Sequence, residues 1–290
     1  MSELQELARY LFAAGAGPNP SGDGVSLLYV EGTSLICKEW ADGSFGSQAL
    51  VTSSISSNSP AAAVFSPSKR SVFYIGTSST VCAAHYDEDE EEWVEDELPV
   101  QQKVLAEPSG QLAACLDGKL GTNVFFQDNA RRLVHLDGNF KATVLPAVSI
   151  TPGSPLAAVA ARDGIHVFYA SSDDNAIHQL SHSGSKWVDA TIAKDIEVES
   201  LKKLTVIFMP SGEEGSEAEE PNIFALTDGK KMLQITPGSK VTLGIVDGEG
   251  NYVATTANER SRTINRSGRS GRRGGVIQLI IRGNNNQIMF

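Results

Sequence analysis

The sequence predicts an all-β protein, a six-bladed β-propeller whose last blade is closed by a strand from the N-terminus. Two observations lead to this prediction. A short apolar strand phrase recurs six times along the 290 residues, and a second phrase, rich in small residues, precedes each copy after the first. Short strands with turns between them, repeated every ~40 to 50 residues, are typical of propellers. A β-sandwich of irregular meanders is the alternative fold.

The first phrase predicts the second strand of each blade. Its copies begin at Ser26 (SLLY), Ser71 (SVFY), Asn123 (NVFF), His166 (HVFY), Asn222 (NIFA) and Ile277 (IQLI). The three longest intervals between copies contain charged insertions, at 86–98, 211–221 and 259–275. We therefore treat residues 1–290 as a single propeller domain that carries three loop insertions.

The second phrase predicts an inner strand near a crowded axis, where small and β-branched residues are needed. It reads SPAAAVFS from 59, GQLAACLD from 110, SPLAAVAA from 154, KKLTVIFM from 202 and NYVATTAN from 251. The sixth copy reaches Phe290 after two strands, while RYLFAAGAG at 9–17 resembles the same phrase. Closure of the last blade by this segment would leave no free sheet edge.

Composition excludes several classes of function. The formal net charge of −11 disfavours nucleic acid, because a phosphate backbone would be repelled. No apolar run is long enough to span a membrane, and Glu3 and Glu6 stand where a secretory signal carries basic residues, so we expect a cytoplasmic protein without membrane contact. Cys37, Cys82 and Cys115 are far apart, without metal-type spacing, so we expect no metal and no cofactor.

The segment IHVFYASSDDNAIHQLSHSGSKW at 165–187 is the most complete copy of the repeat. Its unit, I-x-V-F-Y followed by D-x-N-x-I-x-x-L and G-x-x-W, resembles the repeat of the fungal fucose-specific lectins. That resemblance implies six blades with sugar pockets between neighbours. It also implies a clamp in each pocket made of an Arg on the first phrase, a Glu on the next strand and an aromatic ring.

The clamp is missing from this sequence. The Arg position holds Ser26, Ser71, Asn123, His166, Asn222 and Ile277, and the Glu position holds Lys38 or Glu39, Ala83, His135, Gln179 and Gln234. Trp40, Trp93 and Trp187 retain the aromatic in copies one, two and four. A charged hydrogen bond contributes about 1.5–3 kcal/mol, so fucose binding by the family's clamp is disfavoured. In the fourth copy, His166 and Gln179 form a polar pair that we expect to lie beside Trp187.

The chain also resembles fungal natural-product enzymes that share a lectin-like propeller and use its pocket for hetero-Diels-Alder cyclisation. This resemblance, together with a pocket that lacks charged clamps, implies a cofactor-free cyclase of fungal secondary metabolism. Such chemistry needs an apolar pocket that orients two partners and a side chain that moves a proton. We expect His166 and Gln179 to act as catalytic residues on a polyketide or terpenoid substrate. The expected substrate-binding residues are Tyr29, Trp40, Phe73, Phe125, Tyr169 and Trp187. The alternatives are a divergent lectin that binds a sugar and a scaffold whose charged loops carry contacts.

The remaining polar residues predict less. His178 and His182 lie four apart on a strand, so they share a face, which we expect to point into solvent without binding zinc. The acidic insertion at 86–98 predicts a solvated loop. The basic insertion at 259–275 predicts a flexible loop, with a lid or a contact to the acidic loop as alternatives. A homodimer is compatible with all of these predictions.

Overall fold

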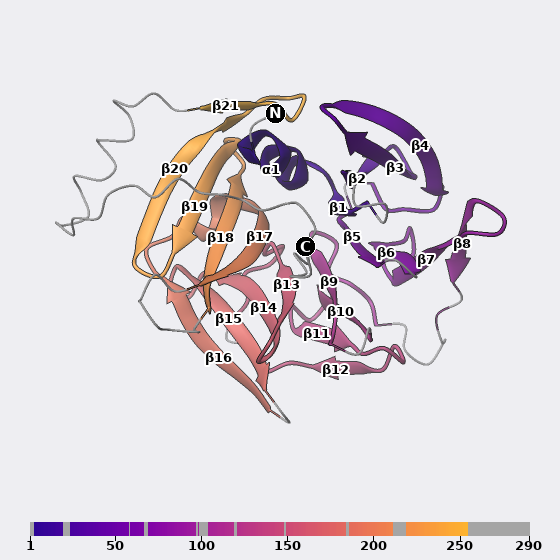
Figure 1. Cartoon of the computed structure of the whole chain (residues 1–290). Helices are drawn as coiled ribbons and strands as arrows, with labels where there is room; N and C mark the ends of the chain where they lie inside the picture. The colour runs from indigo at the N-terminus through magenta and orange to yellow at the C-terminus, as the bar shows by residue number, and fades with distance from the viewer. Residues whose placement is uncertain are drawn as a thin grey trace.

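The computed structural model describes residues 3–254, apart from 20–23, 58, 67–68, 97, 99–103, 119–120, 148, 184–185 and 211–218. These residues form a β-propeller of five described blades, each an antiparallel sheet that radiates from a common axis (Figure 1). The sixth copy of the repeat, with Ile277, and the basic insertion at 259–275 lie outside the described residues. The count of six blades therefore stays a prediction.

Strands follow one another from the axis outward in every blade. The first blade comprises β1 (Gly15–Pro18), β2 (Val25–Glu31), β3 (Ser34–Ala41) and β4 (Ser44–Thr52), and the second comprises β5 (Ala61–Ser66), β6 (Lys69–Ile75), β7 (Val81–Asp87) and β8 (Glu92–Asp96). The third comprises β9 (Leu112–Leu116), β10 (Thr122–Gln127), β11 (Leu133–Leu136) and β12 (Ala142–Val144). The fourth comprises β13 (Ala157–Ala161), β14 (Gly164–Ser171), β15 (Ala176–Ser183) and β16 (Lys186–Ala193). A 3₁₀ turn (Val198–Ser200) leads to the fifth, with β17 (Leu201–Pro210), β18 (Glu219–Thr227), β19 (Lys231–Thr236), β20 (Ser239–Val246) and β21 (Tyr252–Ala254).

Both sequence phrases occupy their predicted places in the second to fifth blades. The apolar phrase forms β6, β10, β14 and β18, and the small-residue phrase forms the inner strands β5, β9, β13 and β17. These inner strands lie side by side around the axis (Figure 1). The alanines of β5, β9 and β13 allow this close approach because they extend little from the backbone.

Each blade is buried on both faces, so its strands contribute to two hydrophobic cores. On β14, Val167 and Tyr169 pack toward the third blade, whereas Phe168 and Ala170 pack toward the fifth. Successive strand residues point to opposite faces, which produces this division. The same alternation decides which polar residues can share a site.

The N-terminal segment differs from its prediction. Residues 9–12 belong to a helix, α1 (Glu3–Phe12), and β1 is the inner strand of the first blade rather than a strand of the last. The spacing of Leu4, Leu7 and Leu11 gives the segment an apolar helical face, which outweighs its likeness to a strand phrase. Leu7 and Leu11 pack on the fifth blade and Tyr10 packs on the first, so α1 lies between these two blades (Figure 1).

Two further segments differ from their predictions. The phrase NYVATTAN contributes β21, which pairs with β20 as a fifth strand of the fifth sheet instead of starting a sixth. In the acidic insertion, Glu92–Asp96 forms the outer strand β8, so the insertion is largely a β-hairpin rather than a loop. Most of the second insertion, 211–218, lies outside the described residues. No helix in the described part of the chain is long and apolar enough to cross a membrane.

The position of α1 predicts an asymmetry between two of its leucines. Replacing Leu11, which is fully buried against the fifth blade, with Ala should lower the free energy of unfolding by about 2–5 kcal/mol, because it leaves a cavity. Leu4→Ala, at a half-buried site on the same helix, should cost clearly less. Urea denaturation followed by circular dichroism measures both, and equal losses would contradict the packing of α1 between the blades.

Candidate functional site

The two clamp positions of the sequence repeat meet in space in three blades. In each case the side chain on the second strand is hydrogen-bonded to the one on the third strand. The pairs are Asn123–His135 at 2.8 Å, His166–Gln179 at 2.7 Å and Asn222–Gln234 at 3.1 Å. Alignment of the sequence repeats therefore identified residues that are structurally equivalent.

The first blade requires a correction at the second clamp position. Gln179 stands two residues before Ser181, which pairs with His166 in the strand register. In the first blade Glu39 pairs with Ser26, so the equivalent residue is Cys37 and not Lys38 or Glu39. The turn between β2 and β3 is shorter than the turn between β14 and β15 of the fourth blade. Counting the same number of residues from the first clamp position therefore leads past Cys37 in the first blade. Burial raises the pKa of the Cys37 thiol to about 11, so this position carries no charge at neutral pH.

The His166–Gln179 pair and Trp187 lie on opposite faces of the fourth blade. The ring of His166 is 5.0 Å from that of Phe208 on the fifth blade, measured between centroids. Trp187 instead pairs with His182 and packs toward the third blade. Because Gln179 and His182 are an odd number of residues apart on β15, their side chains point in opposite directions. The fourth repeat thus does not place its polar pair beside its own tryptophan, as the sequence suggested.

Trp187 completes a site with the pair of the preceding blade. Its ring lies 5.8 Å from His135, 5.9 Å from Phe125 and 4.8 Å from His182, between ring centroids. His135 also stacks on Phe125 at 4.8 Å. We call Asn123, Phe125, His135, His182 and Trp187 the Trp187 site. It lies at the junction between the third and fourth blades and combines an aromatic face with hydrogen-bonding groups.

The protonation of His135 in the Trp187 site follows from its surroundings. Burial lowers the pKa of His135 to about 4, the nearby Asp137 acts in the opposite sense, and His182 lowers the value further. The ring is therefore neutral at pH 7. Asn123 donates through Nδ2 to the carbonyl of Gly121, so its Oδ1 faces His135 Nε2 as an acceptor. This arrangement places the hydrogen on Nε2 and leaves Nδ1 as an acceptor for a ligand hydroxyl.

The other expected substrate-binding residues lie elsewhere. Tyr29 and Trp40 face α1, where the guanidinium of Arg9 lies 3.9 Å above the Trp40 ring. Phe73 is buried in the core between the second and third blades. Of the six aromatics, the structure brings Phe125 and Trp187 together. The catalytic roles expected for His166 and Gln179 stay predictions.

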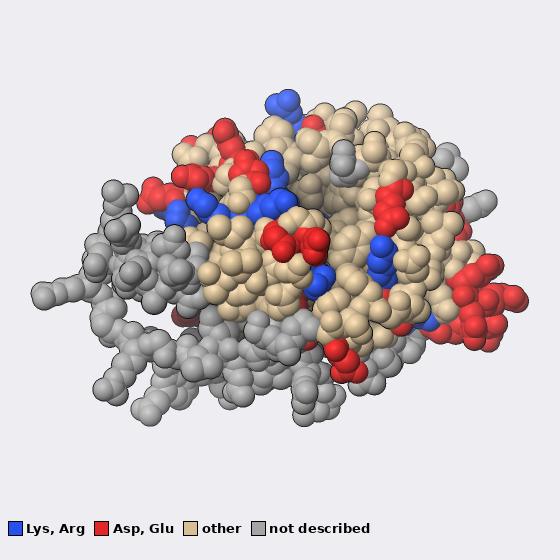
Figure 2. All heavy atoms as spheres, turned by 90° about the horizontal axis from the view of Figure 1, so that it is seen from above, with Lys and Arg blue, Asp and Glu red and all other residues tan. Residues whose placement is uncertain are grey.

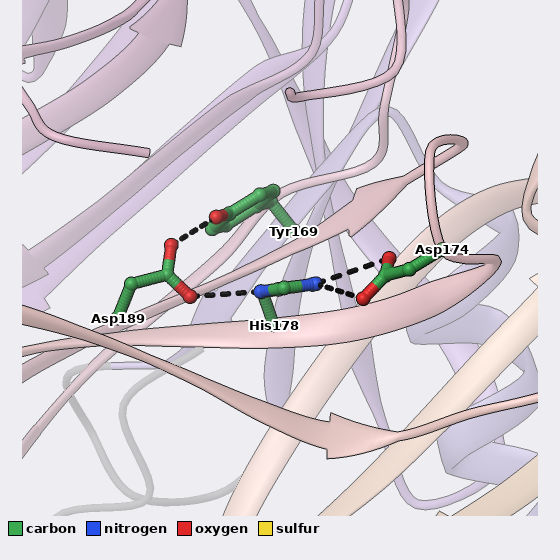
Figure 3. A network of polar contacts seen from close by, with 4 residues as sticks. All are labelled: Tyr169, Asp174, His178 and Asp189. Atoms are coloured by element: carbon green, nitrogen blue, oxygen red, sulfur yellow. Dashed lines mark hydrogen bonds and ion pairs between the residues drawn. The ribbon is translucent and has the colours of Figure 1, made fainter. Parts of the chain in front are cut away.

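Tyr169 and His178 belong to a polar network inside the fourth blade (Figure 3). His178 is 4% exposed, which corrects the expectation that it points into solvent. Its Nδ1 lies 2.8 Å from Asp189 and its Nε2 lies 3.0 Å from Asp174, while the Tyr169 hydroxyl donates to the other oxygen of Asp189. Both ring nitrogens face carboxylate oxygens, and the network joins strands β14, β15 and β16.

A small cavity of about 70 Å³ lies on the propeller axis, and alanines of the inner strands are among the residues that line it. Lys203 reaches into it from β17, and its ammonium donates to the backbone carbonyl of Ala14. Burial lowers the pKa of Lys203 to about 8. No charged partner contributes to this shift, so the cavity holds an unneutralised ammonium.

A dense group of acidic side chains lies on the hairpin of β7 and β8, seen as red spheres at the right edge of the molecule (Figure 2). Arg70 holds this hairpin through two hydrogen bonds to Glu88, of 2.8 and 3.0 Å, and stacks 3.4 Å from the centre of the Tyr86 ring. Within the part of the chain that the structure describes, no group of three His, Cys, Asp or Glu residues gathers as a metal site.

Comparison with known proteins shows which folds this chain resembles. No protein-family model and no curated protein sequence matches the chain. Among solved structures, AofleA from Arthrobotrys oligospora is 13% identical with a TM-score of 0.63, over 83% of this chain and 73% of that one. A variant of the Aleuria aurantia lectin in complex with alpha-methyl-L-fucoside is 15% identical with a TM-score of 0.61, over 81% and 78%.

A further structure of the Aleuria aurantia lectin is described as a six-bladed β-propeller with a novel fucose recognition mode. It is 14% identical with a TM-score of 0.54, over 83% of this chain and 77% of that one. The chain therefore has a β-propeller fold similar to that of fucose-binding lectins. At such identities the likeness concerns the fold, because function depends on the residues of individual sites.

The network around His178 makes a stability prediction. His178→Ala should lower the free energy of unfolding by about 1–3 kcal/mol, because it removes the buried imidazole that links Asp189 to Asp174. His182→Ala is the matched control, since His182 is half-buried on the same strand without such a network, and it should change stability little. Chemical denaturation at pH 7 compares the two variants. If His178→Ala unfolds with the same free energy as the unmodified chain, His178 does not stabilise the fold through this network.

Lys203 predicts a dependence of stability on pH. Its pKa is lower in the folded chain than the ordinary 10.5, so folding opposes its protonation. The penalty, about 3 kcal/mol, is fully present below pH 8 and disappears as the pH rises to about 10.5. Lys203→Met should therefore stabilise the protein at pH 7, with a gain that shrinks toward pH 10. Lys202→Met, at the exposed neighbour, should show no such trend in thermal denaturation.

Proposed function

We propose that the chain is a carbohydrate-binding propeller and that the Trp187 site binds the sugar. The observation that supports this function is the meeting of Trp187 from the fourth blade with the Asn123–His135 pair from the third. A pyranose ring presents an apolar C–H face and a rim of hydroxyls. The indole fits the apolar face, while the amide and the imidazole form hydrogen bonds to hydroxyls.

The same residues narrow the class of sugar. Neither Asn123 nor neutral His135 carries a charge, so the site lacks the guanidinium and carboxylate that would hold a ligand by charged hydrogen bonds. Neutral hydrogen bonds contribute about 0.5–1.5 kcal/mol each, against about 1.5–3 kcal/mol for charged ones. We expect an uncharged monosaccharide or the end of a neutral glycan, bound weakly.

The cyclase predicted from the sequence has less support. The two Aleuria aurantia structures named above are lectins, and no described residue is placed in a way that favours cyclisation over sugar binding. The divergent lectin, which was the alternative from the sequence, is therefore the function that we propose. It rests on the fold and on the composition of one junction.

Substitution of single tryptophans tests the proposal. A glycan array identifies a neutral sugar, and titration calorimetry then measures its affinity. Trp187→Ala should weaken binding at least ten-fold, because the stacking face is lost. Trp93→Ala is the matched control, since Trp93 occupies the equivalent position on β8 at another junction. The proposal is wrong if the unmodified chain binds no sugar, or if the two substitutions reduce the affinity equally.

A further inference from the structure

One position on the inner strands differs sharply between the junctions. The strand register pairs Val64 with Ser71, Cys115 with Asn123, Val159 with His166 and Ile207 with Asn222. In each pair the inner-strand residue is Val64, Cys115, Val159 or Ile207. The next residue along the inner strand points to the preceding blade, toward the clamp positions of that blade. We call it the gate position. Its occupants in the second to fifth blades are Phe65, Leu116, Ala160 and Phe208.

Three of the four gate residues are large and fill their junctions. Phe208 lies 5.0 Å from the ring of His166, and that histidine is only 2% exposed. Phe65 is 9% exposed and packs into the core between the first two blades, 6.2 Å from Trp93. Leu116, 4% exposed, belongs to the core between the second and third blades. At these junctions the polar groups are covered by apolar side chains.

The fourth gate residue is small. Ala160 is partly buried and packs against the core that contains Phe125. Trp187 is also partly buried and packs against the same core. The alanine side chain ends at Cβ and so cannot cover the Asn123–His135 pair. A phenylalanine at this position would add a whole ring. No ring equivalent to Phe208 therefore stands against this pair, in which Asn123 is 5% exposed and His135 is half-buried.

We infer that Ala160 is the specificity-determining residue that keeps the Trp187 site open, and that Phe65, Leu116 and Phe208 close the other three junctions between the described blades. This inference rests on the proposed function. Its consequence is that these four junctions bind one sugar in total. A chain with a single open junction does not cross-link glycans through these blades, in contrast to one with several.

Filling the gate tests the inference. Ala160→Phe should weaken sugar binding at least ten-fold, to the level of Trp187→Ala. Ala161→Phe is the matched control, because the neighbouring residue on β13 points to the opposite side, and it should bind as the unmodified chain does. If Trp187→Ala abolishes binding while Ala160→Phe retains it, the inference fails and the proposed function stands. If the unmodified chain binds no sugar, both fail.

Opening a closed gate gives a test that needs no sugar. Diethyl pyrocarbonate acylates accessible imidazoles, and mass spectrometry locates the adducts. His166 should be unreactive in the unmodified chain and should become reactive, at least ten-fold faster, in Phe208→Ala. His85, whose side chain is 38% exposed, is the internal reference and should react equally in both proteins. An unchanged rate at His166 would show that Phe208 does not close this junction.

Discussion

The structure depends on the burial of every blade on both faces. A strand residue points alternately to one neighbouring blade and to the other, so each sheet must be apolar on two sides. Near the axis the inner strands come so close that many of their positions hold alanine or glycine. A Cβ on Gly15, for example, would lie 2.2 Å from the carbonyl oxygen of Ala61 on the next inner strand. This close packing explains why the sequence phrase of the inner strands is rich in small residues.

The same alternation distributes the polar residues of a repeat between two junctions. A site between blades combines the clamp pair of one blade with an aromatic ring and a gate residue of the next. A single repeat, however well preserved, therefore does not contain a complete site. The best-preserved repeat gives its tryptophan to the Trp187 site and its His166–Gln179 pair to the following junction, where Phe208 covers it. Sequence preservation and ligand access are thus separate properties in this fold.

Helix α1 shows how one segment links blades that are far apart in sequence. Leu7 and Leu11 pack on the fifth blade, while Arg9 covers Trp40 of the first and hydrogen-bonds Asn251 at 2.8 Å. The buried guanidinium lies against an aromatic face and donates to an amide oxygen. Trp40 is therefore occupied by a side chain of its own protein, which separates its role from that of Trp187.

The sequence by itself determined the propeller and the second and inner strands of four blades, because period and alternation are local properties. The resemblance to the lectin repeat implied the two positions at which Asn123 meets His135 and His166 meets Gln179. The sequence did not determine the helix at residues 9–12, since an apolar segment with small residues fits a strand or a helix until it is packed. Nor did it reveal that His178 is buried or that Trp187 packs against His135 of the third blade. Only the tertiary structure decided these points, because they depend on which residues of neighbouring blades face each strand.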